Sequence, residues 1–372
     1  MTLTSEQPVG EREASPTKRS SVVHLFAVIG GLSLVMVAVG WSRWLLSHPS
    51  AAPVGPDRFD GWKSLYLQIF QWATFACAPF VLWRFAVQPA RRERRLTFDG
   101  MLIVGCFTLW FYDPMDNYFN LSFAYNAHFL QLGTWARFIP GYRYPTGYPE
   151  PLLFVGAMYV WMLFGFVLLG CAFMRRLSAR FPQLSTLSLV SACVLMASGA
   201  VFLMEMLFLR TEVWQYPGAS RFLTLWPGTR YQYPVINAFI AGLFFGLLAC
   251  LRFFRDDRGL SFVERGVERM RLPSGGRRTV STLAVTGAVH SLLIIMYFVP
   301  FSWFIALRVD TFPAMPSYMR AGMCGDGTDY ACPGHYVPVP SRTSLHVAPD
   351  DPRLPQSVRD QQGFDHPRGS GQ

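Results

Sequence analysis

The chain has 372 residues, of which 51% are hydrophobic and 16% aromatic, while only 15% carry a charge. A typical soluble domain carries about 25% charged residues, so this composition excludes an ordinary soluble domain and favours an integral membrane protein. The formal net charge of +10 does not by itself indicate a nucleic-acid partner, because basic residues gather beside membrane helices at the cytoplasmic surface.

Seven apolar segments are candidate membrane spans, because each approaches the roughly 20 helical residues needed to cross about 30 Å of hydrocarbon. Backbone groups cannot stay unpaired in lipid, so we expect these segments to be helices. The sequence therefore predicts an all-α integral membrane protein, a bundle of about seven transmembrane helices in the plasma membrane. The predicted spans are residues 22–46, 65–87, 100–120, 152–174, 185–209, 235–254 and 281–306.

The orientation of the bundle follows from the Lys and Arg residues between the spans. The clusters RRERR (91–95) and RRLSAR (175–180) and the basic connector 252–278 fall on one side of the membrane if the helices alternate. Cytoplasmic loops carry the excess of Lys and Arg, so this side should be cytoplasmic. The N-terminus, residues 1–21, then lies in the cytoplasm, and seven spans place the C-terminal residues 307–372 outside.

Both ends of the chain are expected to be largely disordered, because they are rich in Pro, Ser, Asp and Arg and poor in large apolar side chains. Cys324 and Cys332 lie in the Gly-rich stretch MCGDGTDYACPGH on the predicted outer side, where oxidising conditions favour a disulfide between them. A zinc site built from these cysteines and His335 would lack a fourth obvious ligand.

The stretch FYDPMDNYFNLSFAYNAHF, residues 111–129, adds two aspartates, three asparagines and a histidine to the third predicted span. The 13 residues 100–112 form only about 20 Å of helix, which is too short to cross the hydrocarbon alone. The polar residues should therefore lie at membrane depth. Ionisable and amide groups at that depth face a cavity or the bundle interior and are candidates for function.

Two interpretations of this stretch stay open. In the structural one, Asp113 caps a helix that restarts at the following proline, Asp116 lies three residues after the cap, and the other groups form interhelical hydrogen bonds. In the functional one, the stretch continues as a helix with Asp116 near the edge of a polar face, which consists of Asp113, Asn117, Asn120 and His128. Such a face should line a pocket.

Further polar residues fall near the same predicted level of the bundle. Glu205 lies inside the fifth span, about a turn deeper, and has no simple structural explanation. Arg230 and Tyr231 precede the sixth span and would also suit interface anchors, while Glu150 would also suit a helix N-terminus. His290 is expected to be a hydrogen-bonded residue of the bundle. The residues predicted to bind substrate are Asn117, Tyr118, Asn120, Tyr125, Asn126, Glu150, Arg230, Tyr231 and Asn237.

Metal and cofactor chemistry fit the sequence poorly. His128 and His290 are the histidines expected in the bundle, and they do not form the paired spacing of a haem or di-iron site. No nucleotide-binding or serine-hydrolase motif is present. A metal site stays an alternative, built from the carboxylates Asp113, Asp116, Glu150 and Glu205. Otherwise the residue types favour acid and base chemistry without a cofactor.

The polar stretch at 111–129, followed by LGTWARFIPGYRYPTGYPEPLL (132–153), resembles the AveC-like membrane proteins of actinobacteria, which are named after the spirocyclase of avermectin biosynthesis. The resemblance covers roughly residues 65–310 and is densest from 110 to 152. It implies a membrane enzyme that converts a dihydroxy-ketone polyketide into a spiroketal with an accompanying dehydration.

Such an activity would suit the candidate residues. Closing a spiroketal requires a hemiketal hydroxyl to leave as water and a second hydroxyl to lose its proton. Asp113 and Asp116 in a dry pocket would share a proton, with His128 or Glu205 as a base. The expected partners are membrane lipids and a lipophilic, oxygenated small molecule, with no cofactor and no nucleic acid. The alternatives are a non-catalytic lipid-binding or transport component and, third, a structural membrane scaffold.

Overall fold

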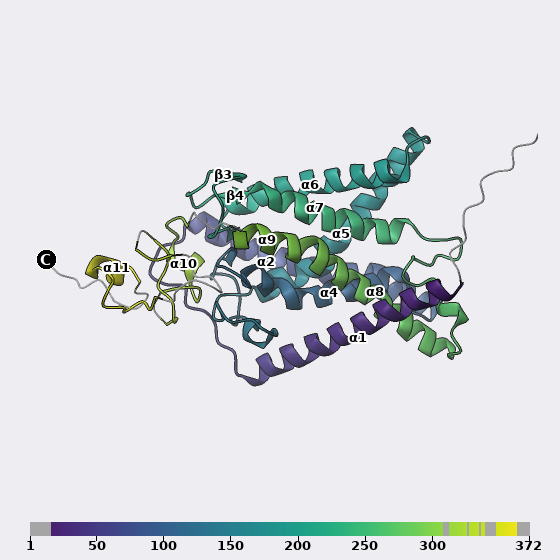
Figure 1. The fold of residues 1–372 in the computed structure, drawn as a ribbon, viewed down its shortest axis with the longest axis horizontal. Helices are drawn as coiled ribbons and strands as arrows, with labels where there is room; N and C mark the ends of the chain where they lie inside the picture. The colour runs from purple at the N-terminus through teal and green to yellow at the C-terminus, as the bar shows by residue number, and fades with distance from the viewer. Residues whose placement is uncertain (1–15, 308–311, 326, 335, 339–346, 363–372) are drawn as a thin grey trace, which may run out of the picture.

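The computed structural model describes residues 16–307, 312–325, 327–334, 336–338 and 347–362. Within them the chain folds into a bundle of long helices, with loops and two very small sheets gathered at one end (Figure 1). Most of the N-terminal segment that was expected to be disordered lies outside the described residues.

Six helical segments of the described chain are long and apolar enough to cross a membrane. They coincide with six of the seven predicted spans, so the prediction of a multi-pass helical membrane protein is confirmed. The candidate spans are Val22–Leu46, Gly61–Glu93, Leu152–Arg180, Thr186–Arg210, Val235–Phe253 and Ser274–Phe304.

Short turns of other helix types join some of the α-helices without a break. The π-helical turns η1 (Leu82–Val87) and η5 (Ile294–Phe298) connect α2 to α3 and α8 to α9. The α-helices are α1 (Pro16–Leu46), α2 (Gly61–Val81), α3 (Gln88–Glu93), α4 (Phe98–Leu109), α5 (Leu152–Arg180), α6 (Thr186–Arg210), α7 (Val235–Phe253), α8 (Ser274–Leu293), α9 (Val299–Leu307), α10 (Ser317–Arg320) and α11 (Gln356–Asp360).

The third predicted span, residues 100–120, differs from the expectation. Helix α4 has 12 residues, about 18 Å of helix, and continues only as the 3-10 helix η2 (Trp110–Asn117), which contains Pro114. Proline removes a backbone donor and disfavours the α conformation of the residue before it, so a regular α-helix does not continue here. Six rather than seven helices of the described chain are therefore long enough to span a membrane.

Glycines allow the closest helix contacts of the bundle. A Cβ atom on Gly30 of α1 would overlap the carbonyl oxygen of Leu283 of α8, and one on Gly287 of α8 would overlap the carbonyl oxygen of Phe26. Gly242 of α7 lies equally close to α6. Helices in lipid are held together by packing rather than by the hydrophobic effect, so small residues that let backbones approach stabilise the pairs α1–α8 and α6–α7.

Two short antiparallel sheets fix the loops at one end of the bundle. Strand β1 (Ala124–Tyr125) pairs with β2 (Trp214–Gln215), so the loop after η2 is joined to the end of α6. Strand β3 (Thr224–Leu225) pairs with β4 (Tyr233–Pro234), which leads directly into α7. These pairings place residues distant in sequence over the same end of the helices.

The opposite end of the bundle carries the basic connectors that follow α3, α5 and α7 (Figure 1). There, Arg252 of α7 donates two hydrogen bonds, from Nε and Nη2, to the two carboxylate oxygens of Asp99 of α4, each 2.8 Å long. This bidentate pair fixes the start of the short helix α4. That this end is cytoplasmic stays a prediction.

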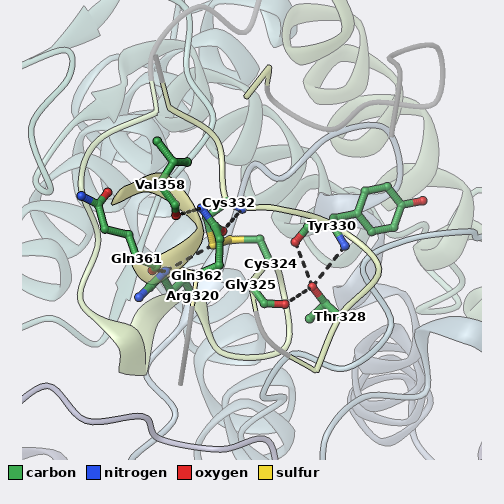
Figure 2. Close-up of a disulfide and its surroundings, with 9 residues drawn as sticks. All are labelled: Arg320, Cys324, Gly325, Thr328, Tyr330, Cys332, Val358, Gln361 and Gln362. Atoms are coloured by element: carbon green, nitrogen blue, oxygen red, sulfur yellow. Dashed lines mark hydrogen bonds between the residues drawn. A yellow bond between two sulfur atoms is a disulfide. The ribbon is translucent and has the colours of Figure 1, made fainter. Parts of the chain in front are cut away.

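The C-terminal segment differs from the expectation of a largely disordered tail. Its described residues pack over the loop end of the bundle, where Tyr318 and Met319 of α10 are buried. Figure 2 shows the disulfide between Cys324 and Cys332. Inside the loop that it closes, the Thr328 hydroxyl bonds to the carbonyl oxygens of Gly325 and Tyr330. His335, weighed as a zinc ligand, lies outside the described residues.

Candidate functional site

A buried cavity of about 90 Å³ lies between the helices near the loop end of the bundle. Its walls come from η2, the β1 and β2 strands, the first half of α5, the second half of α6, α7 and the α8–η5 junction. The wall contains three carboxyl groups, those of Asp113, Asp116 and Glu205, together with Asn237 and several aromatic side chains. Three acidic groups around so small an apolar space are unusual, because burying unpaired charge is costly.

Asp113 is held by two tyrosine hydroxyls. Tyr125 of β1 donates to Oδ2 at 2.9 Å, and Tyr159 of α5 donates to Oδ1 at 2.8 Å. Asp113, Tyr125 and Tyr159 are all more than nine-tenths buried. Hydrogen bonds donated to both oxygens stabilise the carboxylate form and fix its orientation in the cavity wall.

Glu205 is held in a similar way from three sides. Trp214 donates from Nε1 to Oε2 at 2.8 Å, and Tyr216 donates from its hydroxyl to Oε1 at 3.0 Å. Asn237 of α7 donates from Nδ2 to the same Oε1 at 3.2 Å and to the Tyr216 hydroxyl at 2.8 Å. The β2 strand and its continuation thus supply two of the three donors that orient Glu205.

Asp116 is the least constrained of the three carboxyl groups. Its Oδ2 accepts a long hydrogen bond of 3.5 Å from the Tyr297 hydroxyl, and its buried Oδ1 has no hydrogen-bond partner among the described residues. The charges of Asp113 and Glu205 both act on it electrostatically. Like charges close together in a largely apolar cavity cannot all ionise easily, so the protonation of Asp116 depends on its two acidic neighbours.

Glu150 supports this site from behind without lining the cavity. It precedes α5, is fully buried, and accepts a hydrogen bond of 3.1 Å at Oε1 from the indole of Trp110. Burial and the charge of Asp113 raise the pKa of Glu150 well above its usual value. The neutral form of Glu150 is therefore favoured next to Asp113.

The predicted helical stripe in residues 113–128 is wrong, because the chain leaves helical geometry after η2 and pairs as β1. Asn117 instead holds its own loop: Oδ1 accepts from the backbone N–H groups of Ser122 and Phe123, and Nδ2 donates to the Phe123 carbonyl oxygen. Asn120 is buried but does not line the cavity. Asn117 therefore shapes the loop, and neither asparagine lines the cavity.

His128, expected to be a candidate base, also lies away from the cavity. Its ring stacks on Phe59 with the centroids 4.9 Å apart, and it contacts Tyr318 of the C-terminal segment. Burial lowers the pKa of His128 below its usual value, so the neutral ring is favoured. The position packs the C-terminal segment onto the bundle, which is a structural role.

The remaining predicted binding residues surround Glu212, a buried residue with a positive φ of 57°. Lys63 donates to its Oε1 at 2.8 Å, Arg230 approaches that oxygen at 3.4 Å, and the Asn126 amide donates to its backbone carbonyl oxygen at 3.0 Å. Tyr231 packs under the Arg230 guanidinium. These side chains stabilise the loops at this end of the bundle and do not line the cavity. Tyr118 does not line the cavity either, because its hydroxyl donates to the Pro140 carbonyl oxygen.

Three tyrosines of the cavity wall were missed by the sequence argument, namely Tyr159, Tyr216 and Tyr297. A buried tyrosine needs a partner for its hydroxyl, so a tyrosine inside an apolar span is a signal for a nearby acceptor. Tyr159 and Tyr297 carried that signal. The contribution of Tyr216 depends on the pairing of β1 with β2, which no local pattern reveals.

Metal-binding geometry is not formed by the carboxylates. Within the described ranges, no group of three or more His, Cys, Asp or Glu side chains is arranged to hold a metal ion. The alternative site made of Asp113, Asp116, Glu150 and Glu205 is therefore not assembled, since Glu150 lies behind Asp113. His290 of α8 is paired instead with the hydroxyl oxygens of Thr108 and Tyr112, at 2.8 and 3.3 Å.

The fold and the cavity define a multi-pass membrane protein with tyrosine-oriented carboxyl groups buried in its helical bundle. The family model for "Spirocyclase AveC-like" proteins matches residues 93–321, more than half of the chain. The chain therefore belongs to the AveC-like spirocyclase family. The matched range includes all three carboxyl residues of the cavity. Searches of curated proteins and of solved structures gave no match.

Proposed function

We propose that this protein is an acid/base enzyme of the plasma membrane that cyclises and dehydrates a lipophilic, oxygenated polyketide or lipid, forming a spiroketal-type product. One observation carries the proposal: three carboxyl groups converge on a single cavity. Asp113 and Glu205 are buried and oriented by tyrosine hydroxyls, and Asp116 is partly buried, with one oxygen that has no hydrogen-bond partner among the described residues. Membership of the spirocyclase family supports the same reaction class.

The reaction needs an acid and a base but no further reactant. A dihydroxy ketone closes to a cyclic hemiketal, whose hydroxyl is protonated and leaves as water when its C–O bond breaks. The resulting oxocarbenium ion is attacked by the second hydroxyl, a new C–O bond forms, and the proton of that hydroxyl returns to the protein. The balance is one spiroketal and one water for each dihydroxy ketone.

The three carboxyl groups suit different steps of this reaction. Asp116, with its unpaired Oδ1, would donate the proton to the leaving hydroxyl and recover a proton from the attacking one. Asp113 and Glu205, whose hydrogen-bond donors favour the carboxylate form, would stabilise the positive charge that develops on the oxocarbenium carbon. Because Asp113 and Glu205 are oriented before the substrate binds, little reorganisation of these two groups is needed during the reaction.

The rest of the cavity favours an apolar substrate. Phe244, Phe245, Leu293 and Phe298 line part of its wall. Pockets for whole drug-sized ligands measure about 300–1,000 Å³, so this cavity of about 90 Å³ holds the reacting carbons rather than a complete polyketide. The hydrocarbon arms of the substrate would then extend between the helices.

A comparison of cell extracts tests this function. Cells would carry the intact gene, a deletion, or the Asp113→Asn, Asp116→Asn double variant, and their lipids and polyketides would be compared by untargeted mass spectrometry at equal membrane expression. We expect a species to accumulate in the deletion and the double variant that is one water heavier than a product lost from both. A double variant that matches the intact gene would contradict acid/base catalysis, and a non-catalytic lipid-binding protein would then be favoured.

A further inference from the structure

Residues 217–234 form a hairpin beside the ends of α6 and α7, held by the pairing of β3 with β4 (Figure 1). The exposed apolar tip of this loop consists of Phe222 and Leu223, which directly precede β3, and of Trp226 in the turn after it; they are 77%, 50% and 45% exposed. The hairpin sequence contains Arg221 and Arg230 but no Asp or Glu. An apolar tip with only positive charges differs from an ordinary water-exposed loop.

The tip is built to present these side chains outward. Leu223 and Trp226 have positive φ angles of 59° and 48°, which is costly for residues other than glycine. The guanidinium of Arg210, at the end of α6, lies 4.8 Å from the ring centroids of both Trp226 and Tyr231. These cation–π contacts hold the tip against α6 in its strained conformation.

The hairpin is hydrogen-bonded to a residue of the cavity wall. Gln232, which is buried, donates from Nε2 to the carbonyl oxygens of Tyr216 and Pro217 at 2.7 and 2.9 Å. Tyr216 lines the cavity and donates to Glu205. The hairpin therefore connects an exposed apolar tip to a residue that orients a cavity carboxyl group.

We propose that Phe222, Leu223 and Trp226 dock into the headgroup layer of the bilayer around the protein and anchor the hairpin there. The patch lies just beyond the outward-facing apolar side of α6, on which Leu203 and Leu207 are 70% and 54% exposed. Tryptophan, tyrosine and arginine are the residues that accumulate at membrane interfaces. A lipid surface therefore fits the patch, and the inference does not depend on the proposed catalytic activity.

Spin labelling tests the depth of the tip in the full chain. A nitroxide would be attached to Phe222→Cys, and separately to Trp226→Cys, after Cys77→Ser removes an exposed free thiol. The protein would be placed in nanodiscs of phosphatidylcholine and phosphatidylglycerol. Collision of the label with oxygen, which enters lipid, would be compared with collision with a water-soluble nickel chelate. Leu203→Cys gives the lipid-facing control and Ser357→Cys, in the exposed helix α11, gives the water-facing control.

We expect the oxygen-to-nickel ratio at positions 222 and 226 to lie between that at 203 and that at 357, and clearly above that at 357. Ratios equal to that at 357 would show that the tip is in water and would overturn the proposal. Dipolar broadening at 222 that disappears on dilution with unlabelled protein would show that a second copy covers the tip, and would overturn it equally.

Discussion

The Tyr159 hydroxyl donates a hydrogen bond of 2.8 Å to Oδ1 of Asp113 across the boundary between α5 and η2. This contact joins α5, a long and largely buried helix, to η2, where the apolar pattern of a membrane span ends. It fixes one carboxylate of the cavity in place and partly compensates its burial.

Removing that donor should reduce turnover. In Tyr159→Phe, Asp113 keeps the Tyr125 hydroxyl but loses a hydrogen bond to a charged group, worth about 1.5–3 kcal/mol, which corresponds to a roughly ten- to hundredfold lower rate if it is lost in the transition state. Product formation in membranes measures this. Tyr118→Phe, whose hydroxyl contacts the Pro140 carbonyl oxygen outside the cavity, is the matched control. Equal rates for the two variants would contradict the proposed role of Asp113 in the reaction.

Glu150 should make the stability of the protein depend on pH. Folding raises its pKa above 4.5, so above that pH the folded state binds more protons than the unfolded state. The stabilisation from Glu150 is complete below the unfolded pKa and is lost as the pH rises towards the folded pKa, with a slope of at most about 1.4 kcal/mol per pH unit. Asp113 and Asp116 contribute to this shift, and Trp110 opposes it.

The variant Glu150→Gln keeps an acceptor for the Trp110 indole but cannot ionise. Its unfolding temperature should therefore fall less steeply than that of the unchanged protein as the pH rises from about 5. Thermal unfolding in detergent across that range measures the slope, with the exposed Glu93→Gln as control. Parallel curves for the unchanged protein and Glu150→Gln would show that Glu150 does not change its protonation on unfolding.

The contact between α1 and α8 should be sensitive to a single methyl group. A Cβ on Gly30 would overlap the Leu283 carbonyl oxygen, whereas one on the neighbouring Gly31 meets no atom within 4 Å. We expect Gly30→Ala to lower the free energy of unfolding by about 1–3 kcal/mol and Gly31→Ala to leave it unchanged or slightly raised. Thermal unfolding of the two variants checks this. Similar losses for both would mean that α1 does not pack on α8 at Gly30.

The disulfide should protect the C-terminal segment from proteases. It closes a loop between residues 8 apart in sequence, for which chain entropy predicts about 2–3 kcal/mol of stabilisation. In Cys324→Ala, Cys332→Ala, limited proteolysis should cut this segment sooner, while Cys77→Ala, which removes an exposed free cysteine, should behave like the unchanged protein. Unchanged cleavage in the double variant would show that the disulfide does not hold the segment.

Hydrophobic segments alone were enough to place the long helices, because a membrane span needs a fixed length of apolar chain. The same reasoning found Asp113, Asp116, Glu205, Tyr125 and Asn237 as polar residues that should meet near one end of the bundle. They do meet near one end, although Asn237 and Tyr125 act on the carboxyl groups rather than forming a separate binding surface.

Helical periodicity failed in residues 113–128 for a local and a long-range reason. The 3-10 helix η2 has about three residues per turn rather than 3.6, so spacings of four no longer share a face. Beyond it, β1 pairs with β2 some 90 residues later, and such pairing leaves no mark in a short window of sequence. For these two reasons Asn117 and His128 do not line the cavity, although a regular helix would have placed them there.

Whether the cavity carries out chemistry can be decided with Asp116→Asn, purified in nanodiscs beside Asp60→Asn. Asp60 lies at the same end of the molecule, with its carboxylate largely exposed next to Lys63. The compound that accumulates in the deletion strain would be supplied to each, and its binding and its loss of water measured separately. We predict that Asp116→Asn binds the compound with nearly unchanged affinity but forms far less product, while Asp60→Asn matches the unchanged protein. Full turnover by Asp116→Asn would contradict the assignment of this carboxyl group as the acid.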